Sequence, residues 1–318
     1  MNEAFLVSIL AVTIRAGTSL LYATIGEIFT ERSGILNLGV EGIMIMGAVM
    51  GFATAYHSGS VWVGVVAAMG VGGLLALIHA FLTISLQADQ VVSGLVLTLF
   101  GTGMANFLGQ KLGPGGAPLV GLIGPKFLRE PVPVLSELPF VGGSLFNQDL
   151  LVYCIYVLVP VAWFFLYRTR PGLHLRAVGE NPYTADAMGV NVLNVRYFYT
   201  VLGGMLIGLG GAHLSLSYTP GWTEGLTAGR GWIAVALVIF AAWDPARAVI
   251  GAILFGGINA IQFRLQAAGT TIPASFLGMM PYVFTIVVLV AITWWESFSR
   301  RVGAPAALGQ PFVREQRS

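Results

Sequence analysis

The stretch VWVGVVAAMGVGGLLALIHAFLTISL, from Val61 to Leu86, contains no Asp, Glu, Lys or Arg. It is long enough to cross a bilayer as an α-helix, which takes about 20 mostly apolar residues. A membrane-spanning β-strand would instead alternate apolar and polar residues over about ten positions, and this stretch does not alternate. The run from Ala246 to Leu265 has the same character. The sequence therefore predicts membrane helices rather than a barrel.

The whole chain has the composition of a membrane protein. Of its 318 residues, 56% are hydrophobic and 9% are charged, whereas a soluble domain carries about 25% charged residues. The net charge of +2 gives no reason to expect nucleic acid as a partner. The single Cys154 excludes an internal disulfide, and the four histidines are too scattered to form a metal site. The 42 glycines fit helices that approach closely or are broken within the membrane.

Apolar segments of spanning length predict the fold class. We expect an all-α polytopic membrane protein, a bundle of about 8–10 transmembrane helices, some of them broken or re-entrant. Glycines and Arg230 crowd the start of the seventh candidate, so a broken helix is expected there. No cleavable signal pattern is evident after Glu3, so the first segment is expected to remain as a span. The candidates are Phe5–Phe29, Ile35–Tyr56, Val61–Leu86, Val91–Leu112, Leu150–Tyr167, Val195–Tyr218, Leu226–Trp243, Ala246–Leu265 and Phe276–Trp295.

Basic residues near the span ends predict the orientation, because cytoplasmic loops are enriched in Lys and Arg. With the N-terminus outside, most of the 16 Lys and Arg face the cytoplasm. Two connections are then longer than a turn, an extracytoplasmic loop at 113–149 and a cytoplasmic loop at 168–194. We expect residues 1–299 to form the transmembrane domain and residues 300–318 to form a cytoplasmic tail.

The cytoplasmic loop carries the signals of a short helix. Asn181 suits the N-cap, Pro182 the first helical position, and Gly189 the residue after the end. A helix of about two turns is marginal by itself in water, so packing against the bundle or a partner must hold it. From these residues two interpretations stay open, a docking helix for another protein and a capped surface turn.

Four stretches of the chain resemble one family. They are LRAVGENPYTADAMGV in the cytoplasmic loop, ERSGILNLGVEGIMIMGA at 31–48, ADQVVSGLVLTLFGTGMAN at 88–106 and AGRGWIAVALVIFAAWDP at 228–245. They are similar to permeases of ABC importers in the branched-chain amino acid, ribose and nucleoside group. The NLGVEG run makes the chain most similar to the nucleoside (simple sugar) branch. The chain departs from ribose-type permeases in lacking an extra leading span, which leaves the number of helices open.

The resemblance implies a permease subunit that translocates nucleosides or related small sugars across the bacterial plasma (inner) membrane. The subunit would be no enzyme and would bind no cofactor, with ATP and Mg²⁺ handled by a separate ABC ATPase. The chain accordingly has no G-x-x-x-x-G-K-[ST] motif. Other implied partners are a second permease, identical or sister, an extracytoplasmic substrate-binding lipoprotein and the lipid bilayer. In the family a short cytoplasmic coupling helix contacts the ATPase, and the matching residues are Arg176, Gly179, Glu180, Asn181, Pro182, Ala185, Asp186 and Gly189.

Polar side chains within the spans are candidates for the substrate path, because such groups are costly in a bilayer and usually face a cavity or a partner. Asn37 and Glu41 are expected one helical turn apart on one face, in a region that lies along the path in the family. Glu41 can instead brace a broken helix without touching substrate. Two amide pairs repeat this spacing and either line a polar lumen or hydrogen-bond between helices. They are Asn106 with Gln110, and Asn259 with Gln262.

Other polar and aromatic residues have less specific interpretations. His79 and His213 are expected to be satisfied interhelical histidines rather than a proton relay. Trp222 belongs to an outer connection that can receive a binding protein or form an interfacial aromatic belt. Trp243 is expected to be a span-end or lipid anchor.

Three other functions stay open. Within the same class, the substrate can be branched-chain amino acids or simple sugars such as ribose. An ion-coupled secondary transporter would also contain broken helices near the midplane, and dependence on ATP separates it from an importer. An intramembrane enzyme is least favoured, because the sequence shows no adequate pairing of nucleophile and base.

Overall fold

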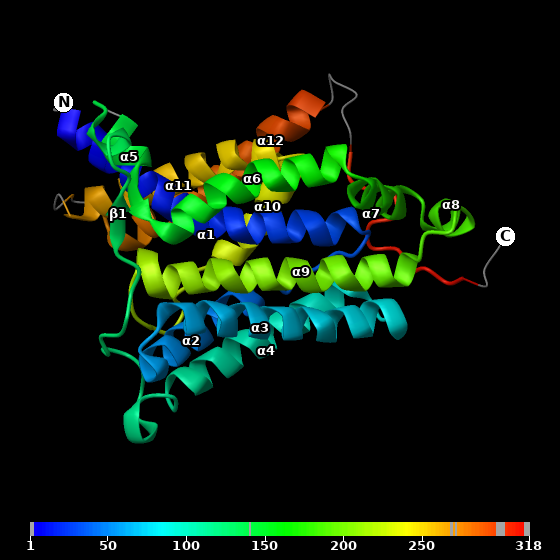
Figure 1. The fold of residues 1–318 in the computed structure, drawn as a ribbon, viewed down its shortest axis with the longest axis horizontal. Helices are drawn as coiled ribbons and strands as arrows, with labels where there is room; N and C mark the ends of the chain where they lie inside the picture. The colour runs from blue at the N-terminus through cyan, green and yellow to red at the C-terminus, as the bar shows by residue number, and fades with distance from the viewer. Residues whose placement is uncertain (1–2, 140, 268–269, 271, 297–302, 315–318) are drawn as a thin grey trace.

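The computed structural model describes residues 3–139, 141–267, 270, 272–296 and 303–314. Long helices lie roughly parallel in one bundle (Figure 1). The start of α1 and the strands lie at one end of the bundle, whereas the two short helices α7 and α8 lie at the other end with the red segment 303–314 (Figure 1). Residues 300–302 and 315–318 of the predicted tail lie outside the described part.

Within the described residues, six helices are long and apolar enough to cross a membrane. They are α1 (Glu3–Arg32), α3 (Val61–Ala80, continued by η1, Phe81–Ser85), α4 (Gln90–Gly109), α6 (Leu150–Arg168), α9 (Val192–His213, continued by η4, Leu214–Tyr218) and α11 (Pro245–Ala267). The bundle also contains α2 (Val40–Ser58), α10 (Arg230–Phe240) and α12 (Ala274–Glu296). Each predicted span contains one of these helices, so the predicted fold class is confirmed.

The loop 113–149 is built from short elements. They are η2 (Pro114–Gly116), β1 (Arg129–Pro131), η3 (Leu135–Glu137), α5 (Val141–Leu145) and β2 (Asn147–Asp149). The two strands pair antiparallel, with Arg129 opposite Asp149. Asp149 then caps α6, because its Oδ1 accepts hydrogen bonds from the N–H groups of Leu151 and Val152.

Helices α1 and α9 form the centre of the bundle and meet at glycines. Helix α1 packs against α9, α10 and α11, and α9 also packs against α2 and α3. A Cβ atom on Gly26 of α1 would lie 2.5 Å from the carbonyl oxygen of Gly203 of α9. A Cβ atom on Gly204 would lie 2.5 Å from the carbonyl oxygen of Gly72 in α3. These helices can meet at backbone distance only because glycine occupies the contacts.

Two helices begin inside the bundle. Residues 34–39 after α1 are not helical, and α2 starts only at Val40. Helix α10 has 11 residues and is about 16 Å long at 1.5 Å per residue, too short to cross a membrane. The break expected in the seventh span is therefore confirmed. Of the predicted span Ile35–Tyr56, only the part from Val40 onward is helical.

Buried side chains explain why the chain can stay non-helical at 34–39. The N–H of Leu36 donates to Oε1 of Gln90 at 2.7 Å, and the carbonyl of Leu36 lies 3.1 Å from Nε2 of His79. The hydroxyl of Thr98 donates to the carbonyl of Leu38 at 2.8 Å. Such partners replace the hydrogen bonds that a helix would have supplied in a medium without water. Because Nδ1 of His79 also lies 2.9 Å from the Ser93 hydroxyl, the prediction of a satisfied histidine is confirmed here.

Candidate functional site

The predicted coupling helix is present and is preceded by another. Helix α8 spans Pro182–Ala187, and its N-cap Asn181 accepts a hydrogen bond from the N–H of Thr184 at 2.9 Å. Gly189 has a φ of +85°, the left-handed conformation expected after a helix end. Helix α7 (Arg170–Glu180) was not predicted. Its signal resembles that of α8, because Thr169 caps it and Pro171 lies in its first turn.

The C-terminal segment 303–314 packs onto these two helices. The N–H of Ala307 donates to the carbonyl of Gly179 at 2.9 Å. The rings of Phe312 and Tyr183 lie 5.1 Å apart, and Arg314 lies 3.5 Å from Asp186. The end surface of the bundle is therefore formed by α7, α8 and this segment together. Nothing in the sequence pattern indicated that the tail belongs to it.

The predicted ATPase contacts divide by exposure. Glu180, Asn181 and Gly189 are exposed. Arg176 and Asp186 are partly buried, and Gly179, Pro182 and Ala185 are buried within the chain itself. A Cβ atom on Gly179 would collide with the carbonyl oxygen of Arg32. The buried three therefore position α7 and α8, and of the eight predicted contacts only Glu180, Asn181 and Gly189 are exposed.

Glu41 caps a broken helix. Its Oε1 accepts hydrogen bonds from the hydroxyl of Thr227 (2.5 Å) and the N–H of Gly229 (2.9 Å), and its Oε2 accepts from the N–H of Gly231 (2.6 Å). These donors stand at the N-terminus of α10, where a negative charge is favourable. The predicted pairing with Asn37 on one helix face is wrong, because Asn37 lies in the extended segment before α2.

Asn106 and Gln110 have different surroundings. Asn106 lies in α4, and within the described residues its buried Oδ1 has no hydrogen-bond partner. Gln110 follows the last residue of α4 and donates to the carboxylate of Glu224 at 3.0 Å in an exposed position. Trp222 in the same outer connection is only 2% exposed, so the aromatic-belt interpretation is wrong for this residue.

Asn259 lies beside a polar cavity. Its Nδ2 donates to the carbonyl of Phe255 at 3.0 Å. Asn259, Gln262, Arg230 and Tyr282 line a cavity of about 340 Å³ between α10, α11 and α12. The Tyr282 hydroxyl donates to the backbone at residue 228 (2.7 Å), and Arg230 lies 5.1 Å from the centre of the Tyr218 ring. Tyr282 was not singled out in the sequence, because one tyrosine in an apolar helix carries no distinct signal.

Three of the five predicted path residues, Glu41, Gln110 and Asn259, lie beside one segment, 219–231. Glu41 binds its end at the start of α10, Gln110 binds Glu224 within it, and Asn259 shares a cavity with its Arg230. Within the described residues, the side chains of these three do not hydrogen-bond one another. What the three have in common is a position beside the connection that enters the bundle.

Two further expectations are corrected by the geometry. Within the described residues, neither ring nitrogen of His213 has a hydrogen bond, and its Nε2 lies 4.0 Å from Asp149. Trp243 is no lipid anchor. It is 6% exposed, and its indole N–H donates to Glu31 at 2.5 Å.

These features define the class of the protein, a multi-pass helical membrane protein with two broken helices meeting inside the bundle. The chain belongs to the family described as "Branched-chain amino acid transport system / permease component", which matches residues 8–295. It is therefore an ABC transporter permease of the plasma (inner) membrane. A permease of this class acts with an ATPase and a substrate-binding partner.

Relatives of the chain match over nearly their full length. TsgC13 of Haloferax volcanii, assigned as a glucose ABC transporter permease protein, is 41% identical over 98% of this chain and 99% of its own. NupC of Lactococcus lactis, a nucleoside ABC transporter permease protein, is 37% identical over 94% of each chain. A solved structure assigned as a metal-chelate type ABC transporter in an inward-facing conformation is 14% identical, with a TM-score of 0.50 over 89% of this chain and 85% of that one. The last likeness concerns the fold alone.

Proposed function

We propose that this permease imports nucleosides, driven by ATP and Mg²⁺ on a separate ATPase that binds α7, α8 and the segment 303–314. The single observation that carries the coupling part is the exposed end surface. There Met188, at the end of α8, is 81% exposed, and Tyr183, within α8, is 42% exposed. The N-cap of α8 is formed by Asn181. A capped helix with apolar side chains outside the lipid is well suited to dock into a partner's groove.

The geometry also connects this surface to the interior. Gly179 of α7 packs on the backbone of Arg32, the last residue of α1. The Arg32 guanidinium donates to the carbonyl of Trp243 at 3.2 Å, just beyond α10. Helix α10 begins at the residues that Glu41 holds. A movement of α7 would therefore reach α1 directly and the C-terminal end of α10 through Trp243.

Nucleoside is proposed as the substrate because of the cavity and the relatives. A cavity of about 340 Å³ is within the range for small-molecule sites, about 300–1,000 Å³. Asn259, Gln262 and Tyr282 can bond to ribose hydroxyls and base edges, and Phe263 supplies an apolar wall. The nucleoside permease NupC supports this choice. Glucose is the second candidate, because TsgC13 is assigned to it and because the same amides bond to sugar hydroxyls.

We further propose a second permease, identical or sister, and an extracytoplasmic binding lipoprotein as partners. In this arrangement loop 113–149 faces outside, and loop 168–194 with the tail faces the cytoplasm. Their location at opposite ends of the bundle supports this assignment (Figure 1).

Reconstituted transport tests the function. Proteoliposomes that contain the permease, its ATPase and the binding protein should take up labelled nucleoside only when ATP is present on the side of the membrane that carries the ATPase. Unlabelled nucleoside should compete with this uptake better than glucose does. If glucose or leucine competes better than nucleoside, that compound and not nucleoside is the substrate. Uptake that needs no ATP and collapses with an ionophore would overturn the function itself.

A substitution tests the coupling surface. Met188→Glu places a charge on the exposed apolar face, and we expect loss of ATPase co-purification with unchanged thermal stability. Ile123→Glu is the matched control, because Ile123 is 94% exposed in the opposite loop. Wild-type ATPase recovery with Met188→Glu would contradict the proposed docking surface.

A further inference from the structure

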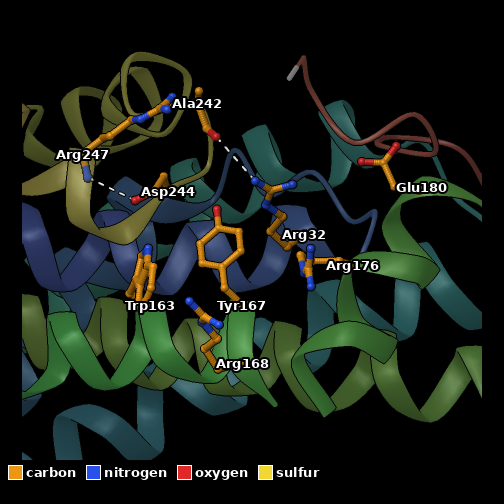
Figure 2. Close-up of a pocket in the computed structure, with 9 residues that line it drawn as sticks. All are labelled: Arg32, Trp163, Tyr167, Arg168, Arg176, Glu180, Ala242, Asp244 and Arg247. Carbon is orange, nitrogen blue, oxygen red and sulfur yellow. Dashed lines mark hydrogen bonds between the residues drawn. The ribbon is translucent and has the colours of Figure 1, made fainter. Parts of the chain in front are cut away.

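A cationic cleft opens at the end of the bundle that carries α7 and α8. It has a volume of about 600 Å³ and lies between the ends of α1, α6 and α7 and the start of α11. Figure 2 shows Tyr167, Arg168 and Arg176 of α6 and α7 below Arg32 of α1, whose guanidinium points to the carbonyl of Ala242. Four arginines line the cleft, with Glu180 and Asp244 as the only carboxylates among the lining residues.

Two of the cleft arginines already donate to backbone carbonyls, Arg32 to that of Trp243 and Arg176 to that of Leu166, and the other N–H groups of the four arginines can bind an anion. Within the described residues, none of them forms an ion pair with a carboxylate. Arg168 and Arg176 lie over the rings of Trp163 and Tyr167, at 6.0 and 5.3 Å from the ring centres. Asp244 is occupied as a cap, because its Oδ1 accepts from the N–H groups of residues 246 and 247. Guanidinium groups held in this way are suited to bidentate binding of phosphate.

A separate apolar groove lies nearby, and α1, α6 and α11 contribute to its walls as they do to those of the cleft. It has a volume of about 280 Å³ between α1, α6 and α11, and its walls include Leu21, Ile155, Val159, Pro160 and Val249. Pro160 precedes the cleft residue Trp163 by one turn of α6, and Val249 follows the cleft residue Arg247 in α11. A polar cavity and an apolar groove thus share the walls formed by α6 and α11.

We propose that the cleft and groove together bind one anionic phospholipid of the cytoplasmic leaflet, with its phosphate on the arginines and one acyl chain between α6 and α11. Basic pockets between helices on the cytoplasmic side are suited to such headgroups. Trp163 is placed where an aromatic side chain marks the interface. No soluble anion would need the groove, and no uncharged lipid would need the arginines.

The dimensions agree with this occupant. Along α6, Ile155 lies eight residues before Trp163, which corresponds to about 12 Å at 1.5 Å per residue. One leaflet contributes about half of a hydrocarbon core of roughly 30 Å. The part of the groove nearest the cleft therefore lies within the leaflet whose headgroups reach the cleft, whereas the far end of the groove reaches Leu145 of α5.

Native mass spectrometry of the full chain in detergent tests the headgroup. Phosphatidylglycerol should stay bound in preference to phosphatidylcholine with the same acyl chains. Arg168→Gln or Arg247→Gln should lower this preference by about tenfold, the effect of one charge-assisted contact. Arg170→Gln is the matched control, because Arg170 is exposed at the same end but does not line the cleft. Equal retention of the two lipids, or an unchanged preference in both cleft variants, would overturn the proposal.

The acyl chain has its own test. Val159→Phe fills the groove and should reduce retention of both lipids, whereas Val157→Phe, at a position 63% exposed on α6, should not. Independently of any variant, wild-type protein should retain phosphatidylglycerol with long chains better than with eight-carbon chains. Displacement of the lipid by excess inorganic phosphate would mean that the cleft holds a free anion, and the proposal would fail. It would also fail if the arginine variants kept the lipid and lost the ATPase.

Discussion

Glu41→Gln distinguishes a brace from a substrate contact. In the structure the Glu41 carboxylate accepts three hydrogen bonds, from Thr227, Gly229 and Gly231. Glutamine keeps one accepting oxygen and turns the other into an NH₂ group, which cannot accept. Because Oε2 faces the N–H of Gly231 and Oε1 faces two donors, at least one donor loses its partner in either orientation of the amide.

The expected loss follows from these contacts. A hydrogen bond to a charged group contributes about 1.5–3 kcal/mol, and a charge at a helix N-terminus about 0.3–1 kcal/mol, more where it is partly buried. Losing one such bond and the charge should therefore cost about 2–3 kcal/mol. At roughly 2 °C per kcal/mol for a chain of this size, the apparent Tm should fall by about 4–6 °C.

The assay is thermal unfolding in detergent with transport measured on the same preparation. Glu224→Gln is the control, because Glu224 is an exposed carboxylate in the same connection that accepts a hydrogen bond from Gln110. Its effect should stay within about 0.5 kcal/mol. A wild-type Tm for Glu41→Gln, together with lost transport, would refute the capping role and make Glu41 a substrate contact.

Two further substitutions test the packing. Gly204→Ala should destabilise the bundle by about 1–3 kcal/mol or more, because the added Cβ atom would collide with α3. The measurement is the Tm in detergent. Gly70→Ala is the control and should leave the Tm unchanged, because a Cβ atom at Gly70 meets nothing within 4 Å. Trp243→Phe leaves the Glu31 carboxyl without its indole donor and should lower the stability by about 1–3 kcal/mol in the same measurement. Trp62→Phe, at a 49% exposed site, is its control and should leave the stability unchanged. Equal Tm values for a variant and its control would contradict the contact that the variant removes.

Local signals in the sequence were sufficient for the helices and their caps. The apolar runs predicted the spans, and Asn181 with Pro182 predicted α8, because a cap needs only neighbouring residues. The glycines at 225, 229 and 231 predicted the late start of α10 for the same reason. In each case the information lies within one or two turns of the feature.

The break at 34–39 could not be predicted in the same way. Its backbone is satisfied by Glu27, His79, Gln90 and Thr98, and three of these lie on helices that follow later in the chain. The sequence of this segment predicts an apolar helix. The segment is non-helical only because those helices bring hydrogen-bond acceptors and donors to its backbone. The packing of the segment 303–314 on α7 depends in the same way on residues more than 100 positions apart.

The two breaks are best understood together. A helix that starts inside a bilayer exposes N–H groups that have no water to bind, so each internal start needs an acceptor from elsewhere in the protein. At α10 that acceptor is Glu41, which itself belongs to the first turn of the other internal start, α2. A lone Glu41 carboxylate would be costly in the membrane, and so would the unpaired N–H groups at the start of α10. Each offsets the cost of the other by hydrogen bonding. Because each break supplies what the other lacks, movement of α10 must either carry the start of α2 with it or separate the carboxylate from its donors, and a transport cycle that uses these helices has to do one or the other.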